Sequence, residues 1–267
     1  MKQLSIFLLL LTFSLSALSI SNDEFDRLIS EIQDKKFDSV ESYLEKNKGA
    51  KEPEYYVLLL NYSYSKGENT QIVVGSGEPK AGDFSLQSQA TGKTEGYIGE
   101  RTTYDKELII SGIKRAQIAL KDFPERLDIH FGIITLAERI EEWEIAGDQL
   151  VTILRTSKEI DNKWSWGRIN SMQGDPVDFM IQNILPRTYT FFRLNNEVGD
   201  KQLEKVSTAL IKYYPNLIYG YANMGSLFMA KKEYDKAESY YTKALAIDGT
   251  DQIILSNLEN LKKLRSQ

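Results

Sequence analysis

The sequence predicts an all-α protein built from repeated helical hairpins, with one small β-hairpin insertion. Apolar and small residues recur at spacings of three and four along most of the chain, which is the period of one helix face. The same run of intervals occurs twice, at Gly112, Ala116, Ala119 and Pro124 and again at Ala237, Tyr241, Ala244 and Gly249. One stretch rich in Gly, Ser and Thr, between Lys66 and Asp105, breaks this pattern and favours β strands.

The amino-acid composition is that of a globular protein with a hydrophobic core. It also excludes several kinds of functional site. Of 267 residues, 42% are hydrophobic and 27% are charged, which fits one or two globular domains. The net charge of −5 disfavours nucleic acid as a partner, because such proteins carry a basic surface. The chain has no cysteine, so disulfides, thiolate metal sites and a lipid-anchored cysteine are excluded. With His130 as the single histidine, we predict no metal site and no cofactor.

The N-terminal residues 1–19 have the layout of a secretory signal peptide. Lys2 is followed by an apolar run from Leu4 to Leu15 and by small residues up to Ser19. The apolar run is shorter than the roughly 20 residues that a membrane span needs. We therefore expect cleavage after Ser19, no membrane span in the remaining chain, and a periplasmic or secreted protein. Export without disulfides favours a bacterial periplasm.

Residues 20–267 are expected to form one helical repeat domain, and its helices follow in order. The periodic segments pair into hairpins at 22–47, 53–66 with 106–122, 129–154, and 177–194 with 200–214. The clearest pair occupies 218–251. A final helix over 252–264 carries Leu255, Leu258 and Leu261 on one face, and we expect it to cap the stack.

The insertion, at about 68–104, is predicted to be a small β flap between two helices of one hairpin. Short β-prone runs at Thr70–Val74, Phe84–Gln87 and Gly96–Thr103 are separated by glycines. Because Lys66 and Asp105 would end adjacent antiparallel helices, their backbones are expected to lie close together.

The pair at 218–251 resembles a tetratricopeptide repeat. In this family a small residue in each helix lets two antiparallel helices pack closely, and we expect Gly225 to face Ala237. The resemblance implies a helical solenoid, and its packing signature falls on Tyr221, Met224, Gly225, Phe228, Ala237, Tyr241 and Ala244. In the earlier repeat the packing positions would be Val57, Leu60, Asn61 and Tyr64.

A broader resemblance concerns the order of segments along the chain. A repeat helix, a Gly-rich β insertion, a second repeat helix, a Trp-Ser-Trp sequence at 164–166 and a closing repeat follow one another. This order resembles exported tetratricopeptide-repeat proteins of Bacteroidetes-type bacteria. The resemblance implies architecture and location, and it implies no chemistry.

The tetratricopeptide resemblance also implies a partner-binding groove, because the first helix of each pair lines the concave face in this family. These groove positions fall on Tyr55, Leu58, Tyr62, Tyr219, Ala222, Ser226 and Met229. The Lys and Asn residues of the family's clamp for C-terminal carboxylates are absent from these positions. An amphipathic groove that takes a peptide or protein is therefore expected.

Three functions are compatible with the sequence. The favoured one is an exported, non-enzymatic scaffold that binds a protein or peptide on its concave face and β flap. The alternative is a small-ligand or glycan binder of the cell envelope. Trp164 and Trp166 would either bind a sugar by ring stacking or pack against the side of the helical solenoid. We favour the packing role. A hydrolase comes third, because its candidate acids, Asp83, Glu95, Glu100 and Glu141, show no opposed pair.

Overall fold

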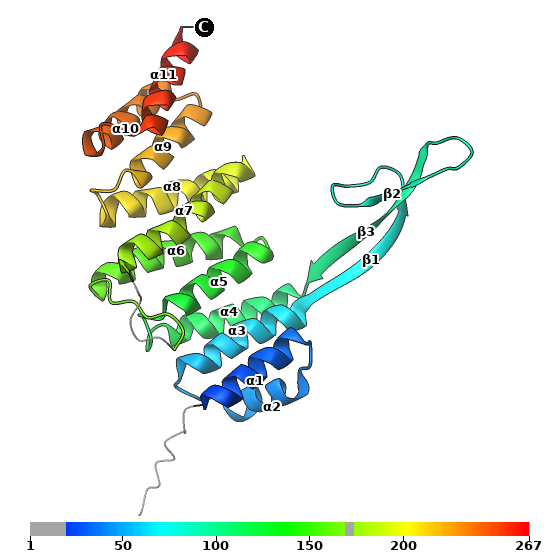
Figure 1. The fold of residues 1–267 in the computed structure, drawn as a ribbon. Helices are drawn as coiled ribbons and strands as arrows, with labels where there is room; N and C mark the ends of the chain where they lie inside the picture. Colours follow the sequence, from blue (N-terminus) through cyan, green and yellow to red (C-terminus); the bar gives the residue numbers. More distant parts are fainter. Residues whose placement is uncertain (1–19, 169–173, 267) are drawn as a thin grey trace, which may run out of the picture.

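Helices dominate the chain. A computed structural model describes residues 20–168 and 174–266; the predicted signal peptide at 1–19 lies outside the described residues. Those residues form eleven helices and a three-stranded antiparallel sheet (Figure 1). The helices are α1 (Asn22–Gln33), α2 (Asp38–Lys46), α3 (Pro53–Gly67), α4 (Lys106–Ala119), α5 (Leu127–Arg139), α6 (Trp143–Glu159), α7 (Pro176–Leu194), α8 (Glu197–Tyr213), α9 (Tyr219–Ala230), α10 (Tyr234–Ile247) and α11 (Gln252–Arg265). The strands are β1 (Glu68–Ser76), β2 (Phe84–Gln87) and β3 (Thr94–Tyr104). A mainly helical fold with a small β insertion is thus confirmed.

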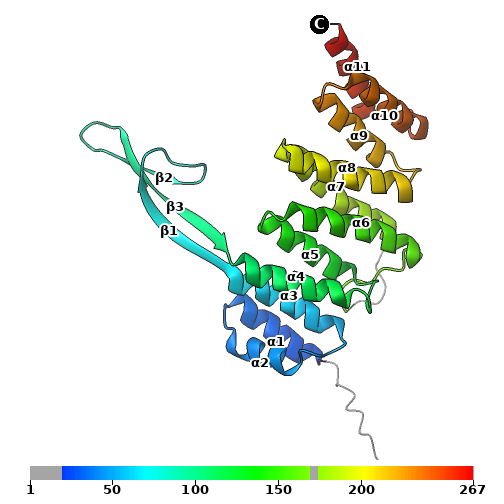
Figure 2. The same cartoon turned by 180° about the vertical axis from the view of Figure 1, so that it is seen from behind.

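Neighbouring helices pack as antiparallel hairpins, and successive hairpins stack on one another. The pairs α3–α4, α5–α6, α7–α8 and α9–α10 each pack closely. Figures 1 and 2 show them following one another from α1 and α2 at one end to α11 at the other. Contacts of α6 and of α9 with α8 join the second half of the pile.

Side-chain caps fix where several of the helices begin. The side chains of Ser21, Asp105, Asp175, Asn196 and Asp251 each accept a hydrogen bond from a backbone N–H of the first turn. Such a bond satisfies a donor that has no partner within the helix, and it contributes about 1 kcal/mol.

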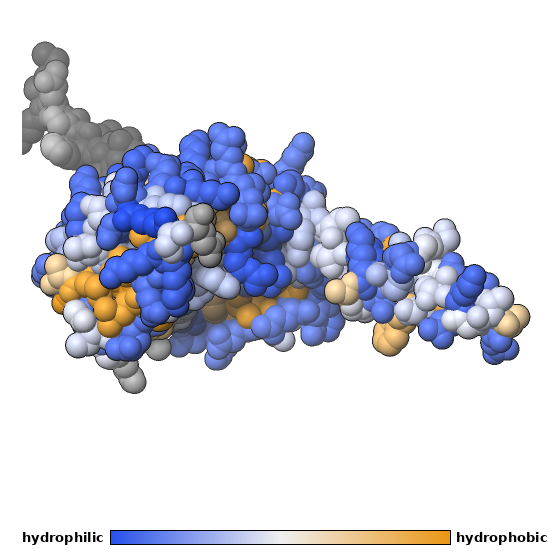
Figure 3. Space-filling view, turned by 90° about the horizontal axis from the view of Figure 1, so that it is seen from above, coloured by the Kyte–Doolittle hydropathy of each residue, from blue (hydrophilic) through white to orange (hydrophobic). Residues whose placement is uncertain are grey.

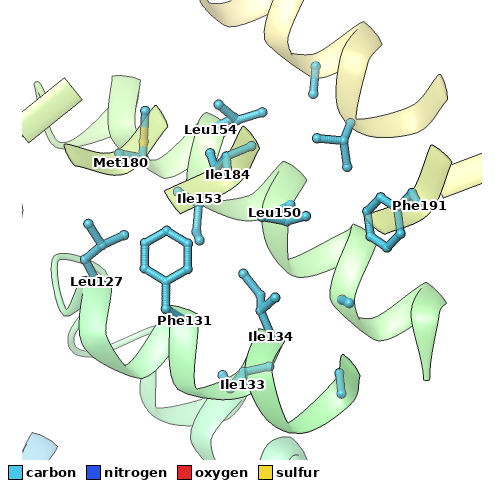
Figure 4. Close-up of a cluster of buried hydrophobic side chains, with 14 of the residues drawn as sticks. Leu127, Phe131, Ile133, Ile134, Leu150, Ile153, Leu154, Met180, Ile184 and Phe191 are labelled. Carbon is cyan, nitrogen blue, oxygen red and sulfur yellow. The ribbon is translucent and has the colours of Figure 1, made fainter. Parts of the chain in front are cut away.

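The largest buried cluster runs from α3 to α9 and consists mainly of Ile and Leu. Figure 4 shows its centre, where Phe131 of α5 points toward Ile153 of α6 and Ile184 of α7. Two smaller clusters lie under α1–α3 and under α9–α11. Each hairpin therefore buries its apolar side against its neighbours.

One packing position of α3 differs from the predicted one. Asn61 was expected to pack as the small residue of the pair, but it is exposed. A Cβ added at Gly112 of α4 would collide with the Ser63 hydroxyl, so Ser63 is the small residue that faces α4. The small-residue position of α3 is therefore Ser63 and not Asn61, whereas Leu60 is buried as predicted.

The α9–α10 pair is tightly packed, but Gly225 has a different neighbour from the predicted one. A Cβ at Gly225 would lie 2.6 Å from ring carbons of Tyr241, and these are its nearest atoms, not those of Ala237. Both Ala237 and Tyr241 are fully buried. Of the other signature residues, Met224 and Ala244 are buried, and Tyr221 and Phe228 are half-buried.

Helix α11 covers the last hairpin, and two of the three residues predicted for its packing face, Leu258 and Leu261, lie on that face. Ile254 and Leu261 are buried, and Leu258 is half-buried. Leu255, which was expected on this face, is 39% exposed.

The three strands form a flap that projects from the α3–α4 junction (Figures 1 and 2). The strand order is β1-β3-β2, and all pairs are antiparallel. At its base, the Asp105 N–H donates to the Gly67 carbonyl at 2.8 Å. The predicted strands and the expected proximity of the two helix ends are therefore confirmed.

Candidate functional site

A groove of about 380 Å³ opens between α3, α5 and α7. Its lining comes from these three helices, which are the first helices of three successive hairpins, and from the loop after α6. The lining residues are Val57, Leu60, Asn61, Tyr64, Asp128, Ile129, Phe131, Gly132, Thr135, Leu136, Trp166, Asn183 and Arg187. We call this site the α3–α5–α7 groove.

Aromatic rings form the floor of the groove. The ring centroid of Trp166 lies 6.3 Å from that of Phe131, and 5.2 Å from that of Phe179 in an edge-on contact. Trp166 remains 37% exposed. An indole that contacts two rings and is still partly exposed is a rigid apolar contact surface for a ligand.

The Trp-Ser-Trp loop holds this indole in place through its backbone. The Ser165 N–H donates to the Glu125 carbonyl at 2.9 Å, and the Ser165 carbonyl accepts from the Leu127 N–H at 3.0 Å. Trp164 is buried edge-on against His130, with ring centroids 5.6 Å apart. Trp164 therefore has the packing role that we favoured from the sequence, whereas Trp166 faces the groove.

Two asparagines supply polar groups at the walls. The Asn61 Nδ2 donates to the Val57 carbonyl at 2.8 Å, and the Asn183 Nδ2 donates to the Phe179 carbonyl at 2.9 Å. Each bond stays within one helix and directs the side chain. Within the described ranges, neither Oδ1 accepts a hydrogen bond, so both oxygens can accept from a ligand.

Arg187 and Glu138 form a loose ion pair at one end of the groove. The Arg187 Nε lies 3.7 Å from the Glu138 Oε1, and neither atom has a hydrogen-bond partner among the described residues. The guanidinium also lies 5.1 Å from the centroid of the Phe131 ring, and Nη1 donates to the Asn183 carbonyl at 2.6 Å. Burial raises the pKa of Glu138, and the Arg187 charge opposes this shift. The pair is half-buried, and it places one positive and one negative charge at this end of the groove.

A second charged cluster fixes the other end of the groove. Arg126 is buried, and it donates to Glu54 at 3.0 Å and to both carboxylate oxygens of Asp128 at 2.9 and 2.8 Å. Burial lowers the pKa of Arg126, but the two carboxylates more than offset that effect. Their bonds tie the start of α3 to the start of α5.

Two of the predicted groove residues are core residues. Tyr55 and Leu58 are fully buried, so they cannot contact a partner, and the assignment is wrong for both. The Tyr55 hydroxyl donates to the Leu44 carbonyl at 3.2 Å. The four residues of α3 that were predicted to pack, Val57, Leu60, Asn61 and Tyr64, all line the groove, and of these Leu60 is also buried as predicted.

The other predicted residues lie outside the α3–α5–α7 groove. The Tyr62 hydroxyl donates to Glu41 of α2 at 2.8 Å, on a different side of α3. Tyr219, Ala222, Ser226 and Met229 on α9 are half-buried. The hydroxyl oxygen of Ser226 lies 3.1 Å from that of Tyr241, so this side chain faces α10. Sequence reasoning missed Arg187 and Asn183, and their only signal is a spacing of four on one helix face.

The candidate acids of a hydrolase are dispersed. Asp83, Glu95 and Glu100 lie in the flap, and Glu141 lies in the turn between α5 and α6. Arg101 pairs with Asp83 at 2.7 Å and lowers the pKa of Asp83 to about 2. In residues 20–168 and 174–266, no group of three His, Asp or Glu side chains could hold a metal ion. Over the same ranges, no helix combines the length and the apolar character that crossing a membrane requires.

Comparison with protein families identifies one part of the chain. Residues 218–251, which span α9 and α10, match the tetratricopeptide repeat. The repeat predicted at these residues is therefore confirmed, and it indicates a role in binding other proteins. The search of curated proteins found no match to the chain.

Proposed function

We propose that the protein is a non-enzymatic interaction scaffold, a solenoid of tetratricopeptide-like hairpins that binds a peptide or protein segment. The α3–α5–α7 groove is the observation that carries this proposal, because it combines an open aromatic floor with unused hydrogen-bond acceptors. The tetratricopeptide match at residues 218–251 supports a protein partner. In this proposal the groove belongs to the concave face of the solenoid.

The chemistry of the groove fits an extended peptide. One apolar or aromatic side chain of the peptide would pack on Trp166 and Phe131. Backbone N–H groups would donate to the Oδ1 atoms of Asn61 and Asn183. A few polar groups around an apolar floor are typical of sites that fix the orientation of a ligand.

The proposed location is outside the cytoplasm. Residues 1–19 would act as a signal peptide, and residues 20–267 would be a periplasmic or secreted domain without a lipid anchor. This part of the proposal rests on the sequence, including the likeness to exported Bacteroidetes-type repeat proteins.

A glycan or other small ligand is the second candidate function, and one observation favours it. Trp166 shares the groove with Asn61, Asn183 and Asp128, and an indole beside amide and carboxylate groups suits a sugar ring. Asp128 already accepts two hydrogen bonds from Arg126, which leaves the asparagines as the main polar contacts.

A binding experiment with one tryptophan variant and one control variant tests the proposal. The wild-type protein and Trp166→Ala are used to capture partners from a cell-envelope extract, and bound peptides and glycans are identified separately. We expect Trp166→Ala to bind at least about tenfold more weakly, because buried aromatic anchors contribute most of the affinity at such sites. Tyr189→Ala is the matched control, since Tyr189 is an exposed aromatic on α7 that does not line the groove. Equal capture by both variants would contradict the groove as the binding site. Capture of a glycan alone would favour the second candidate.

A further inference from the structure

The β flap has one apolar face that is largely uncovered. Residues directly opposite one another in a sheet share a face, and Val74 and Phe84 both pair with Ile98. Ile72 and Leu86, two residues along, extend the same face. Ile72 is 74% exposed, Val74 is 70% exposed and Phe84 is 77% exposed. Figure 3 shows apolar side chains protruding from the otherwise hydrophilic flap.

The opposite face of the flap is closed by its own side chains. The Tyr97 ring lies over Gly75, where a Cβ would come within 2.6 Å of the ring. The Arg101 guanidinium lies 5.2 Å from the centroid of the Tyr97 ring and donates to both carboxylate oxygens of Asp83 at 2.7 Å. Side chains of the flap therefore cover one face of the sheet, and the apolar face remains exposed to solvent.

The outer edge of β1 is also unpaired in the described part of the chain, because β1 pairs only with β3. At the base of the flap, the Gly67 carbonyl accepts from Asp105, and the register continues without a shift. Odd-numbered residues therefore bond to β3, and Thr70, Ile72 and Val74 point their backbone N–H and C=O groups outward.

This edge lacks the devices that usually protect a free strand. The segment Asn69–Ser76 has neither a charged residue nor a proline. Soluble proteins commonly place lysine, proline or a bulge on a free edge, so that other strands cannot pair with it. A long uncharged edge with β-branched residues is instead suited to accept another strand.

We propose that a second copy of this chain pairs with that edge, antiparallel to it, with Ile72 on the two-fold axis. Ile72 is the middle residue of the nine-residue strand, so the two strands overlap over their full length. Ile72 then lies beside Ile72 of the second copy, and Val74 lies beside its Thr70. The result is a continuous six-stranded sheet with an isologous interface.

Charge also fits a second copy. In this register, the nearest charged residue on the strand, Glu68, lies opposite Ser76 of the second copy. Glu100 is directly opposite Ile72 on β3, which places it one strand away from the edge. No two like charges face each other across the interface. A strand pairing of this size is small, so we expect association in the micromolar range.

Sedimentation of the purified protein between about 1 and 500 μM tests the pairing. The wild-type protein is expected to shift from one chain to two as the concentration rises. Ile72→Lys is expected to weaken association at least tenfold, because two lysines would meet at the two-fold axis. Within one chain this lysine would face Glu100, so the flap itself tolerates the change.

Phe84→Lys is the matched control. Phe84 lies on the same apolar face but on β2, away from the pairing edge, and this variant should associate like the wild type. If both variants weakened association equally, the apolar face, and not the edge of β1, would form the contact between the two copies. That result, or a wild-type protein that stays a single chain at 500 μM, would overturn the proposal.

Cysteine cross-linking gives a second test of the proposed strand pairing. The chain has no cysteine, so a single cysteine at position 72 can be linked to its copy by a short bifunctional thiol reagent. Ile72→Cys should yield covalent dimers, and Phe84→Cys should yield few. Equal yields from both positions would exclude the proposed register.

Discussion

His130 is a buried residue whose two ring nitrogens both have partners. Its Nε2 donates to the Pro124 carbonyl at 3.1 Å, and its Nδ1 accepts from the Gln149 Nε2 at 2.6 Å. The ring is therefore held in its neutral form. Burial lowers its pKa from 6.5 to about 4, although the Pro124 carbonyl and the Asp128 charge act in the opposite direction.

This shift predicts a loss of stability in mild acid. As the pH falls below about 6.5, the unfolded chain takes up a proton at His130 and the folded chain does not, so unfolding becomes easier until about pH 4. Between pH 7.5 and pH 5.0 the loss from this residue is about 2 kcal/mol. Urea unfolding at both pH values, for the wild type and His130→Gln, measures it. A pH dependence of equal size in the variant would contradict the assignment.

Gly225 allows a close contact between α9 and the Tyr241 ring. Gly225→Leu would force the ring and the helix apart, and overpacking of this kind costs about 1–3 kcal/mol. Ala230→Leu introduces the same side chain on the same helix at an exposed position, and it should change the free energy of unfolding by less than about 0.5 kcal/mol. Thermal and urea unfolding of both variants check the difference. Similar unfolding midpoints for the two variants would contradict the tight packing at Gly225.

At the scale of elements, we expect the helices to fold without the flap. Its ends meet at the hydrogen bond between Gly67 and Asp105, so a short turn can join α3 to α4. Replacing Asn69–Thr103 by a short Gly/Ser turn should change the free energy of unfolding by no more than about 1 kcal/mol, because loop-closure entropy changes slowly with length. Circular dichroism should retain the helical signal. Loss of that signal would mean that the flap covers part of the helical core.

The order and type of the elements can be predicted from sequence, but the buried face of some helices cannot. In α9 and α10 the small residues Gly225 and Ala237 mark one face clearly. In α3, Leu58, Leu59 and Leu60 are consecutive, so apolar residues surround the helix and do not define a single face.

The same difficulty affects α11, where residues 253–255 are all apolar and the buried one is Ile254, not the predicted Leu255. The groove was harder to predict, because it depends on the separation of α5 and α7. Trp166 contacts Phe131 of α5 and Phe179 of α7, and the backbone bond from Ser165 to Glu125 holds its loop. All of these contacts join residues that are far apart in sequence. No local pattern encodes these contacts.

At the scale of the whole molecule, export predicts a shortened chain. N-terminal sequencing of protein isolated from its native host should start at or near Ile20. The same protein should appear in the periplasmic or culture fraction and carry no lipid. An intact Met1 on cytosolic protein would contradict the proposed export.

The length of β1 has a consequence for how the molecule could reach its targets. Nine residues at about 3.3 Å each give a strand of roughly 30 Å. In the pairing proposed above, the two antiparallel strands overlap over this length. The two helical domains would therefore be attached at opposite ends of one continuous sheet, at a fixed distance from each other. Two binding grooves at a set separation favour a target that repeats its recognition sequence, because the second site would bind at a raised effective concentration. The flap would then select targets by the spacing of their motifs.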